Sequence, residues 1–320
     1  MITSPEVLCA GIIVADHLCA PIARLPNAGE LIMTERMVLA SGGCAANAAV
    51  DLVKMGVRSA IVGRVGDDVF GRVVSEMLQQ AGVDVSLVRV SPGKDTSQTL
   101  IVNVQNEDRR FIHTFGANSD FRAGDIPVPL PAGCRVLYLG GYLLMPTLQQ
   151  EELIPVFQSA RSQGIATVLD VGIPHPASDY LKRLDRLLPF VDVFLPNQHE
   201  AELITGENDP FRQATIFHQL GAGTVVITRG GEGAVLLRND CRLQSGVFAV
   251  PFVDGSGGGD AFDAGYIYGL LHQQSPRECL RLASALGASC VRAVGTTHGV
   301  FQEKECAEFL ERNSLAISEW

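Results

Sequence analysis

The sequence predicts an α/β fold in which a mostly parallel sheet is covered by helices on both faces. Strand-like apolar runs alternate with segments of helical periodicity along most of the 320 residues, as expected for parallel strands joined by helices. The hydrophobic content of 47% is sufficient for a large core. Two segments lack intervening helices and predict an additional small β-sheet. We therefore expect a single domain over residues 1–320 with a small β-sheet lid.

The predicted elements follow one another in a regular order. A strand over Val7–Val14 is followed by a helix over Ala45–Met55, a strand over Ser59–Val65 and a helix over Val69–Gln80. Four later apolar runs, each followed by turn residues and helical periodicity, predict further buried strands. These runs are Arg135–Leu139, Ala166–Asp170, Val191–Leu195 and Thr224–Thr228.

Residues 17–40 and 96–116 interrupt this alternation. In the second segment, Gln98–Val104 and Arg110–Phe115 are strand-like and enclose a polar turn, which is typical of a β-hairpin. The two segments predict either a lid over a pocket or an ordinary antiparallel extension of the sheet edge.

Charge and cysteine usage argue against several classes of function. With 25 Lys and Arg against 35 Asp and Glu, the net charge is −10, so we expect no nucleic-acid partner. Neither a signal-peptide pattern nor an apolar run of membrane-spanning length is visible, so we expect a cytoplasmic protein without a membrane partner. The eight cysteines include no C-x-x-C pair, which argues against a disulfide framework or a zinc site.

The most informative stretch is Val253–Phe262, in which four glycines precede Asp260 and a helix-like segment. Glycines leave backbone N–H groups accessible, and the first turn of a helix adds unsatisfied donors and a positive dipole end. An acid beside such an anion site can take the proton of a hydroxyl that attacks a phosphoryl group. We predict that Gly257, Gly258 and Gly259 bind developing negative charge and that Asp260 is the general base. A glycine-rich turn with a capping aspartate is the alternative.

A second glycine motif, Ser41–Ala49, predicts a binding site for a polyol. Backbone at Gly42 and Gly43 can approach the ligand closely, and Asn47 offers a donor and an acceptor to adjacent hydroxyls. A strand-to-helix turn with an amide cap is the alternative. The chain contains neither a P-loop sequence nor a G-x-G-x-x-G after the first strand, so the glycines before Asp260 are the predicted phosphate site.

These two motifs resemble the N-terminal and C-terminal signatures of the ribokinase-type (PfkB) carbohydrate kinase family. Gly56 and Gly66 fall at the spacings that complete the first signature, and Asp254–Gly265 resembles the second. The signatures occur in the family's order, so the resemblance covers nearly the whole chain. It implies a ribokinase-like three-layer α/β/α fold and a Mg2+-dependent kinase that transfers the γ-phosphoryl group of ATP to a hydroxyl of a small carbohydrate.

The resemblance assigns roles to three polar residues outside the signatures. Asp16 matches the aspartate that binds substrate hydroxyls, a task that suits a carboxylate because it accepts two hydrogen bonds; an Asx turn is the alternative. Asn197 and Glu200 match the family's N-x-x-E motif, which helps to hold Mg2+ and phosphates, largely through water. A helix N-cap with a first-turn acid fits the same two residues.

The resemblance also implies a nucleotide turn and a cation site. Thr228, Gly230 and Gly233 resemble the nucleotide-binding T-x-G-x-x-G turn, for which a plain hairpin turn is the alternative. Asp254 and Ser256 lie where some members bind a monovalent cation such as K+. Here Gly255–Ser256 replaces the usual pair of threonines and Gly258 the usual alanine, which weakens the case for cation activation.

Two segments on the substrate side depart from the motifs of the family, so the sequence does not identify the sugar. Asp170–Pro174 stands where many sugar kinases have D-x-N-x-R, and Gly140–Tyr142 lacks the glutamate that ribokinase offers to ribose. A nucleoside kinase of the same fold is one alternative, although the aromatic content of 6% favours a sugar. A catalytically silent sugar-binding protein is the other, although retention of Asp260, Asn197 and Glu200 argues against it.

The predicted lid carries two adjacent arginines, Arg109 and Arg110. Because side chains alternate along a strand, at most one of them can face a pocket, and Arg110 is the substrate-binding candidate. An inward arginine would favour substrates with a carboxylate or a phosphate. The alternative is that both arginines are solvated at the hairpin. The resemblance further implies a homodimer formed through the lid.

Overall fold

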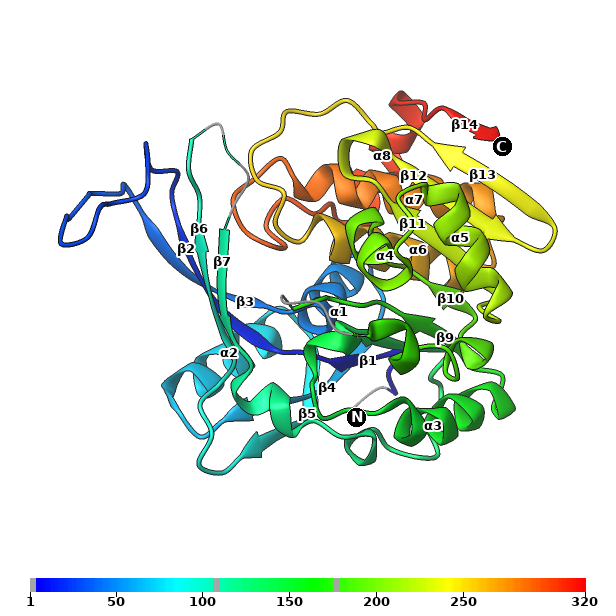
Figure 1. Ribbon diagram of the computed structural model, residues 1–320, viewed down its shortest axis with the longest axis horizontal. Coiled ribbons are helices and arrows are strands. Elements are labelled where there is room, and N and C mark those ends of the chain that lie inside the picture. Colours follow the sequence, from blue (N-terminus) through cyan, green and yellow to red (C-terminus); the bar gives the residue numbers. More distant parts are fainter. Residues whose placement is uncertain (1–3, 106, 108–109, 175–178) are drawn as a thin grey trace.

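The computed structural model describes residues 4–105, 107, 110–174 and 179–320. Its largest element is a sheet of ten strands (Figure 1). These are β1 (Val7–Gly11), β4 (Ser59–Gly66), β5 (Asp84–Ser91), β8 (Val136–Gly140), β9 (Ala166–Leu169), β10 (Val193–Phe194), β11 (Thr224–Thr228), β12 (Ala234–Arg238), β13 (Cys241–Ser245) and β14 (Ile317–Glu319). Their order is β14-β13-β12-β11-β10-β9-β8-β1-β4-β5, and every pair from β11 to β5 is parallel. The last three strands of the chain add an antiparallel edge.

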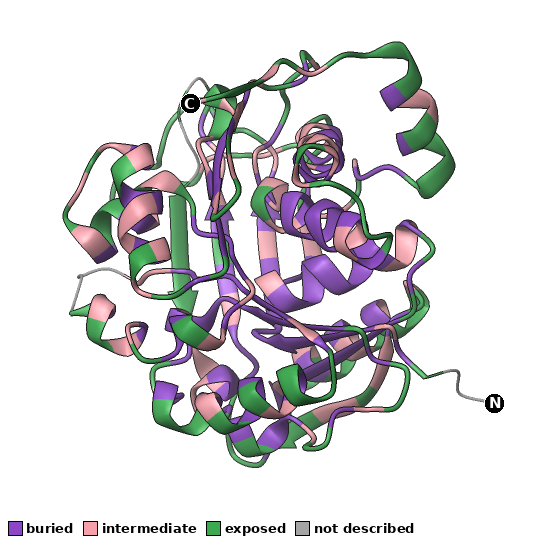
Figure 2. Ribbon diagram, turned by 90° about the vertical axis from the view of Figure 1, so that its right-hand side faces the viewer, coloured by how far each residue is buried: buried purple, intermediate pink, exposed green. Residues whose placement is uncertain are grey.

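Helices cover both faces of this sheet because successive strand side chains point to opposite sides. Cys9 and Tyr138 belong to one buried layer, and Leu8 and Leu137 to the other. The first layer contains α1 (Cys44–Lys54), α2 (Val69–Gln80), α6 (Gly258–Leu271), α7 (Pro276–Cys290) and α8 (Glu303–Arg312). The second contains α3 (Gln150–Ser162), α4 (Gln198–Thr205) and α5 (Pro210–Gln219). Figure 2 shows the buried strands between these layers, which confirms the predicted three-layer fold.

Short 3₁₀ helices lie in the connections between these elements. They are η1 (Gly116–Asp120), η2 (Ala123–Asp125), η3 (Tyr142–Leu144), η4 (Tyr180–Arg183), η5 (Leu188–Phe190) and η6 (Gly230–Glu232). In the described part of the chain, no helix combines the length and apolar character needed to cross a membrane.

A separate four-stranded sheet projects from the main body (Figure 1). Its order is β3 (Met37–Gly42), β2 (Val14–Cys19), β6 (Gln98–Val102) and β7 (Arg110–Thr114). Asp16 is paired with Thr99, and Thr99 with His113, so the three side chains share one face. His17 faces the other side, where its ring contacts Phe70 of α2. The predicted small sheet is therefore present, with one polar row on a single face.

The predicted elements and the observed ones differ in three places. The strand predicted over Val7–Val14 is divided, because the chain turns at Gly11 and the residues from Val14 onward enter the small sheet. Within residues 17–40 only the two ends are strands. The half-exposed strand β5 and the hairpin of β12 and β13 were not predicted, because neither is followed by the helix that marks a parallel strand.

Trp320, the only tryptophan of the sequence, packs against the antiparallel edge of the main sheet. Its indole nitrogen donates to the carbonyl oxygens of Leu236, at 3.3 Å, and Leu243, at 3.0 Å. Its ring also packs edge-on against Phe211 of α5. These contacts tie the last residue to β12, β13 and the helical layer.

Candidate active site

Polar and glycine residues from several parallel strands meet at the carboxyl ends of those strands. Asp170 follows β9, Asn197 follows β10, and Thr228 ends β11. Asn197 and Thr228 are joined by a β-bridge, so these two chain segments lie side by side. This edge is where open α/β sheets bind ligands.

The predicted anion site is the turn that opens α6. Gly257 is the N-cap of this helix, with a φ of 75°, and Gly258 and Gly259 are its first two residues. A Cβ on Gly257 would lie 2.0 Å from the carbonyl oxygen of Thr296, so only glycine fits this position. The N-terminus of α6 therefore offers backbone N–H donors and residues without side chains to the cavity, as an anion site requires.

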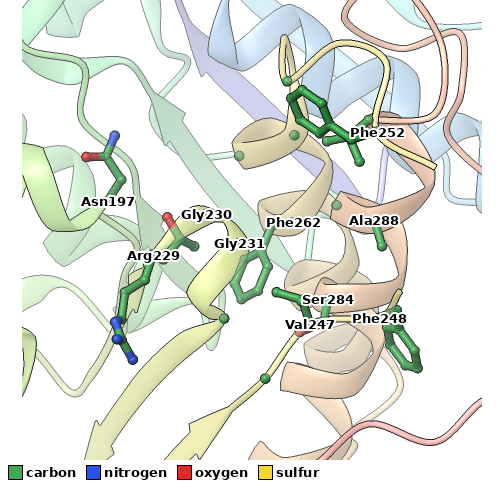
Figure 3. A pocket seen from close by; sticks show the side chains of 18 of the residues that line it. Asn197, Arg229, Gly230, Gly231, Val247, Phe248, Phe252, Phe262, Ser284 and Ala288 are labelled. Atoms are coloured by element: carbon green, nitrogen blue, oxygen red, sulfur yellow. The ribbon is translucent and has the colours of Figure 1, made fainter. Parts of the chain in front are cut away.

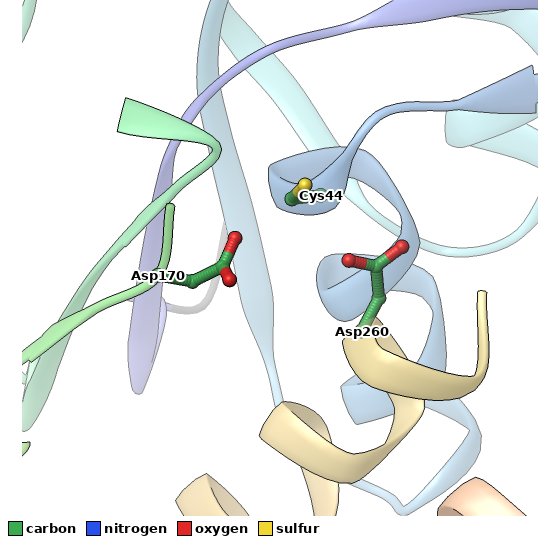
Figure 4. A group of neighbouring side chains, drawn as sticks. All are labelled: Cys44, Asp170 and Asp260. Carbon is green, nitrogen blue, oxygen red and sulfur yellow. The ribbon is translucent and has the colours of Figure 1, made fainter. Parts of the chain in front are cut away.

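Asp260 stands in the first turn of α6 and contacts α1. The side-chain nitrogen of buried Asn47 donates to its Oδ2 atom at 2.7 Å. Figure 4 shows Cys44, Asp170 and Asp260 converging from three different elements, and their ligand atoms lie within 4.8 Å of one another. The predicted base thus lies where α1, α6 and the end of β9 meet.

The predicted acceptor site lies between this cluster and the small sheet. Asp16 is 5% exposed, and a Cβ on Gly42 would lie 1.8 Å from its Oδ2 atom, so the carboxylate rests directly on the Gly42 backbone. Burial raises the pKa of Asp16 to about 7; a hydrogen bond with Thr99 opposes this shift, and the charge of Asp260 adds to it. Thr99 in turn shares a 3.0 Å hydrogen bond with the ring of His113.

Negative charge accumulates where the two sites join. Burial, and then the charge of Asp260, raises the pKa of Asp170 to about 8. Burial also holds the pKa of Glu200 well above its usual range, and the charge of Asp170 is the next cause. Ligand atoms of Asp170 and Asp260 lie within 4.8 Å of each other, so the two groups repel each other when both are ionised, and a cation bound there would relieve that repulsion.

Asn197 and Glu200 form a reciprocal cap at the start of α4. The Asn197 side chain accepts from the Glu200 N–H at 2.9 Å, and the Glu200 carboxylate accepts from the Asn197 N–H at 2.8 Å. The capping interpretation of this motif is thus correct. It leaves the predicted Mg2+ role open, because each carboxylate or amide oxygen can accept further contacts.

A cavity of 820 Å³ connects the predicted nucleotide turn to the anion site (Figure 3). Asn197, Thr228, Gly230 and Gly233 line one end, together with η6, and Gly258 and Gly259 line the other. The remaining wall is largely apolar. It includes Val247, Phe252, Phe262, Ala288 and Val291, with the hydroxyl residue Ser284 among them.

The two residues predicted to bind a monovalent cation, Asp254 and Ser256, take part in internal hydrogen bonds. Asp254 Oδ1 accepts from the N–H of Ser256 at 3.0 Å and from its hydroxyl at 2.8 Å. Asp254 Oδ2 accepts from the Gly295 N–H at 3.0 Å. These bonds join the glycine turn to the loop that follows α7.

The predicted lid arginine Arg110 lies outside the acceptor site. Arg110 is exposed and forms an ion pair with Glu107. His113 shares the face of Asp16, and side chains alternate along β7, so Arg110 lies on the opposite face of the small sheet. Its predicted contact with substrate finds no support in this geometry. Arg109 lies outside the described residues.

Four residues of the site were not predicted as site residues from the sequence. Thr99 and His113 belong to it through strand register, which the sequence does not reveal. Cys44 lies in the Ser41–Ala49 motif but was not a candidate site residue, and Asp170 entered only as the first residue of the segment that stands in place of D-x-N-x-R. The position of Asp170 after a buried strand, at the ligand-binding edge of the sheet, was a usable signal.

Comparison with known proteins gives the family. The model of the pfkB family carbohydrate kinases matches residues 4–303. The chain belongs to the pfkB family of carbohydrate kinases. Kinases of this family are phosphotransferases that act on an alcohol group, and the chain is an enzyme of this class.

Individual pfkB relatives point to more than one acceptor. The chain is 28% identical to the ribokinase of Haemophilus influenzae over 94% of its own length and 97% of that protein. It is 30% identical to the cytidine kinase of Thermococcus kodakarensis over 77% of its length and 86% of that protein. The structure of Arabidopsis thaliana ribokinase complexed with ribose and ATP has a TM-score of 0.80 at 24% identity, covering 97% of this chain and 99% of that chain. This last likeness concerns the fold.

Proposed function

We propose that this pfkB kinase transfers the γ-phosphoryl group of ATP to a hydroxyl of a small sugar. The observation that carries the proposal is the position of Asp260. It directly follows Gly258 and Gly259, which line the 820 Å³ cavity, and its carboxylate accepts a hydrogen bond from Asn47 of α1. A hydroxyl placed between Asp16 and Asp260 would face the phosphoryl group at the glycine turn.

Asp260 acts as the general base in this proposal. It takes the proton of the acceptor hydroxyl, while Gly257, Gly258 and Gly259 supply backbone donors to the transferring phosphoryl group. Asp16, Gly42, Gly43 and Asn47 hold the sugar. Most of the rate enhancement then comes from positioning and charge stabilisation.

The nucleotide occupies the cavity beside Thr228, Gly230 and Gly233. Its phosphates are proposed to reach Asn197 and Glu200, which would hold Mg2+, largely through water. Burial, and after it the charge of Asp170, raises the pKa of Glu200, and a divalent cation would favour its ionised form. When bound, Mg2+ supplies positive charge that neutralises the phosphate oxygens. The cation role of Asp254 and Ser256 stays a prediction.

A nucleoside acceptor is the second candidate function. It is favoured by the 30% identity to a cytidine kinase and by the aromatic ring of His113, beside Thr99 on the face of Asp16. We place the sugar first because both Asp16 and Asn47 are polar groups suited to vicinal hydroxyls. The alternative of a catalytically silent binding protein is set aside, because kinases of the pfkB family are phosphotransferases.

We further propose a homodimer in which the small sheet acts as a lid. Leu100, Phe111 and Ile112 expose apolar side chains on this sheet, and Leu31 and Met33 do so in the segment between β2 and β3. Apolar groups gathered on a projecting element are typical of a protein interface. Gel filtration at micromolar concentration tests this; a 34.2 kDa species alone would contradict it.

The proposed reaction is tested by coupled ADP release with ATP and Mg2+ over a panel of pentoses, hexoses and nucleosides. We expect release that depends on one group of neutral sugars. Release with nucleosides only would transfer the proposal to the second candidate. No release with any acceptor, from protein that still binds ATP, would contradict the proposed reaction. The predicted cytoplasmic location is a separate question that cell fractionation answers.

A further inference from the structure

The glycine turn of α6 is supported from behind by the loop that follows α7. The carbonyl oxygen of Thr296 lies against Gly257, at the place where a Cβ would be. The buried Cys290 thiol lies 3.2 Å from the carbonyl oxygen of Ser256 and 3.1 Å from that of Thr296. Because Gly295 also donates to Asp254, the turn and this loop, residues 293–297, form one hydrogen-bonded unit. Displacing the loop would displace the donors at Gly257–Gly259.

Helix α1 holds this loop through its last residue. The Lys54 ammonium donates to the carbonyl oxygen of Thr297 at 2.5 Å. One residue earlier in the loop, the Thr296 hydroxyl donates to the carbonyl oxygen of Ser41, just before α1 begins, at 3.3 Å. Since Asn47 in the first half of α1 holds Asp260, both ends of this helix act on the same turn.

A buried carboxylate lies one turn before Lys54. Asp51 is 0% exposed, and neither of its carboxylate oxygens has a hydrogen-bond partner among the residues that the structure describes. Burial raises its pKa well above the usual range, and the charge of Lys54 is the cause that lowers it. After desolvation, Asp51 is also the group that most raises the pKa of the Cys290 thiol. A carboxyl group in such a place is costly without a nearby cation, and Lys54 supplies one.

Several oxygen atoms of this unit, of the kind that could bind a monovalent cation, already accept hydrogen bonds from the protein. Both oxygens of Asp254 accept hydrogen bonds from Ser256 and Gly295. The carbonyl oxygens of Ser256 and Thr296 share the Cys290 thiol, and that of Thr297 accepts from Lys54. Lys54 thus brings a positive side chain to the loop that supports Asp254 and the glycine turn.

We infer that Lys54, one turn after the buried Asp51 and bonded to Thr297, is a positioning residue for phosphoryl transfer and replaces an added monovalent cation behind the glycine turn. The inference rests on the proposed kinase reaction. Lys54 touches neither the nucleotide cavity nor the acceptor residues, so it acts through the loop of residues 293–297. Its loss should lower kcat and leave the KM for the acceptor nearly unchanged, because the transition-state donors move while the acceptor site remains.

The test compares Lys54→Met, Lys54→Arg and, as a matched control, Lys304→Met on the exposed face of α8, where the lysine side chain is 88% exposed. We expect kcat to fall about tenfold or more in Lys54→Met, to be largely retained in Lys54→Arg, and to be unchanged in the control. Ammonium ions should partly restore Lys54→Met only. The wild type should work equally well in sodium, potassium or large organic cations.

The double variant Asp51→Asn/Lys54→Met separates an effect of Lys54 on protein stability from its effect on the position of the glycine turn. Removing the buried charge should restore the thermal midpoint lost in Lys54→Met without restoring kcat. A second readout does not need turnover: hydrogen–deuterium exchange of the peptide containing residues 254–262 should be faster in Lys54→Met than in the wild type or in Lys304→Met.

The outcomes are distinguishable. A wild type without ADP release defeats the proposed function, and the exchange measurement then still decides the role of Lys54. Wild-type kcat in Lys54→Met, unchanged exchange in residues 254–262, or a wild type that needs potassium would each overturn the inference.

Discussion

The proposed nucleotide half and the proposed acceptor half of this site differ in the kind of residues that form them. The cavity between η6 and α6 is formed by glycine turns and apolar side chains such as Phe252 and Phe262. The acceptor side is formed by buried carboxylates, of which Asp16 and Asp170 have raised pKa values. Backbone shape therefore matters most in the first half, and ionisation in the second. Substitutions that alter only one half can test whether backbone shape or ionisation controls its contribution to activity.

Asp260 joins the two halves, and its removal should have the largest effect. Asp260→Asn keeps the size of the side chain but removes the base, so we expect kcat to fall on the order of a thousandfold. Binding of ATP and of the acceptor should change little, as measured by calorimetry. Asp240→Asn, at an exposed position paired with Arg238, is the control. Turnover within tenfold of the wild type would remove Asp260 from its proposed role.

A backbone substitution in the nucleotide half should come next. Gly257→Ala places a Cβ against the Thr296 carbonyl at a φ of 75°, so the turn must shift and its donors with it. We expect kcat to fall on the order of a hundredfold and the free energy of unfolding to drop by about 1–3 kcal/mol. Gly124→Ala, where a Cβ meets nothing within 4 Å, controls for the added methyl group. Equal effects in the two variants would show that the turn is not strained.

Ionisation in the acceptor half should appear as a pH dependence of Asp16. Its pKa is raised from 3.8 to about 7, so the folded state binds the proton more tightly than the unfolded state. The stability that this provides is complete below about pH 4 and is lost as the pH rises through about 7. The thermal midpoint of the ligand-free wild type should therefore fall more steeply than that of Asp16→Asn between about pH 5 and about pH 8.

The same residue should control acceptor binding in the opposite direction. The carboxylate accepts two hydroxyl hydrogen bonds, so the acceptor KM of the wild type should decrease from about pH 6 to about pH 8. In Asp16→Asn the KM should be about tenfold or more higher and independent of pH over this range. A pH-dependent KM that survives in Asp16→Asn would assign the ionisation to another group, with Asp170 the first to examine.

The smallest effect is expected at Arg110. Its ion pair with Glu107 and its position opposite the Asp16 face predict that Arg110→Ala changes the acceptor KM less than about twofold. Steady-state kinetics with the preferred acceptor measures this. A rise of tenfold or more would restore the arginine to the acceptor site and would require the small sheet to present its other face, for example across a dimer.

Sequence reasoning located the nucleotide half better than the acceptor half. Glycine turns and the start of α6 are contiguous in the chain, so Gly257–Asp260 and Thr228–Gly233 could be recognised from short motifs. Thr99 and His113 reach Asp16 only through strand register, and register depends on pairing that no local pattern gives. Likewise, Asp51 falls on an ordinary helical pattern, and only packing reveals it as a buried charge without a hydrogen-bond partner in the described part of the chain.

Prediction of the fold likewise succeeded for elements with a local pattern and failed where the chain path depends on tertiary structure. Alternation of apolar strands and helices predicted α1, α2 and β11 closely, because each element follows one periodicity from end to end. The division between β1 and β2 was missed because the apolar run continues across it and the turn depends on the conformation of Gly11. A continuous hydrophobic pattern does not show that the chain has passed into another sheet.

The location of Trp320 gives this enzyme a selective optical reporter. The single indole lies between β12, β13 and α5, hydrogen-bonded to two main-chain carbonyls, and it does not line the nucleotide cavity. Intrinsic fluorescence excited at the tryptophan band should therefore remain nearly constant on titration with nucleotide or sugar. The same emission should change when the antiparallel edge opens, so that melting curves recorded by fluorescence describe this edge, and activity loss on heating can be timed against it.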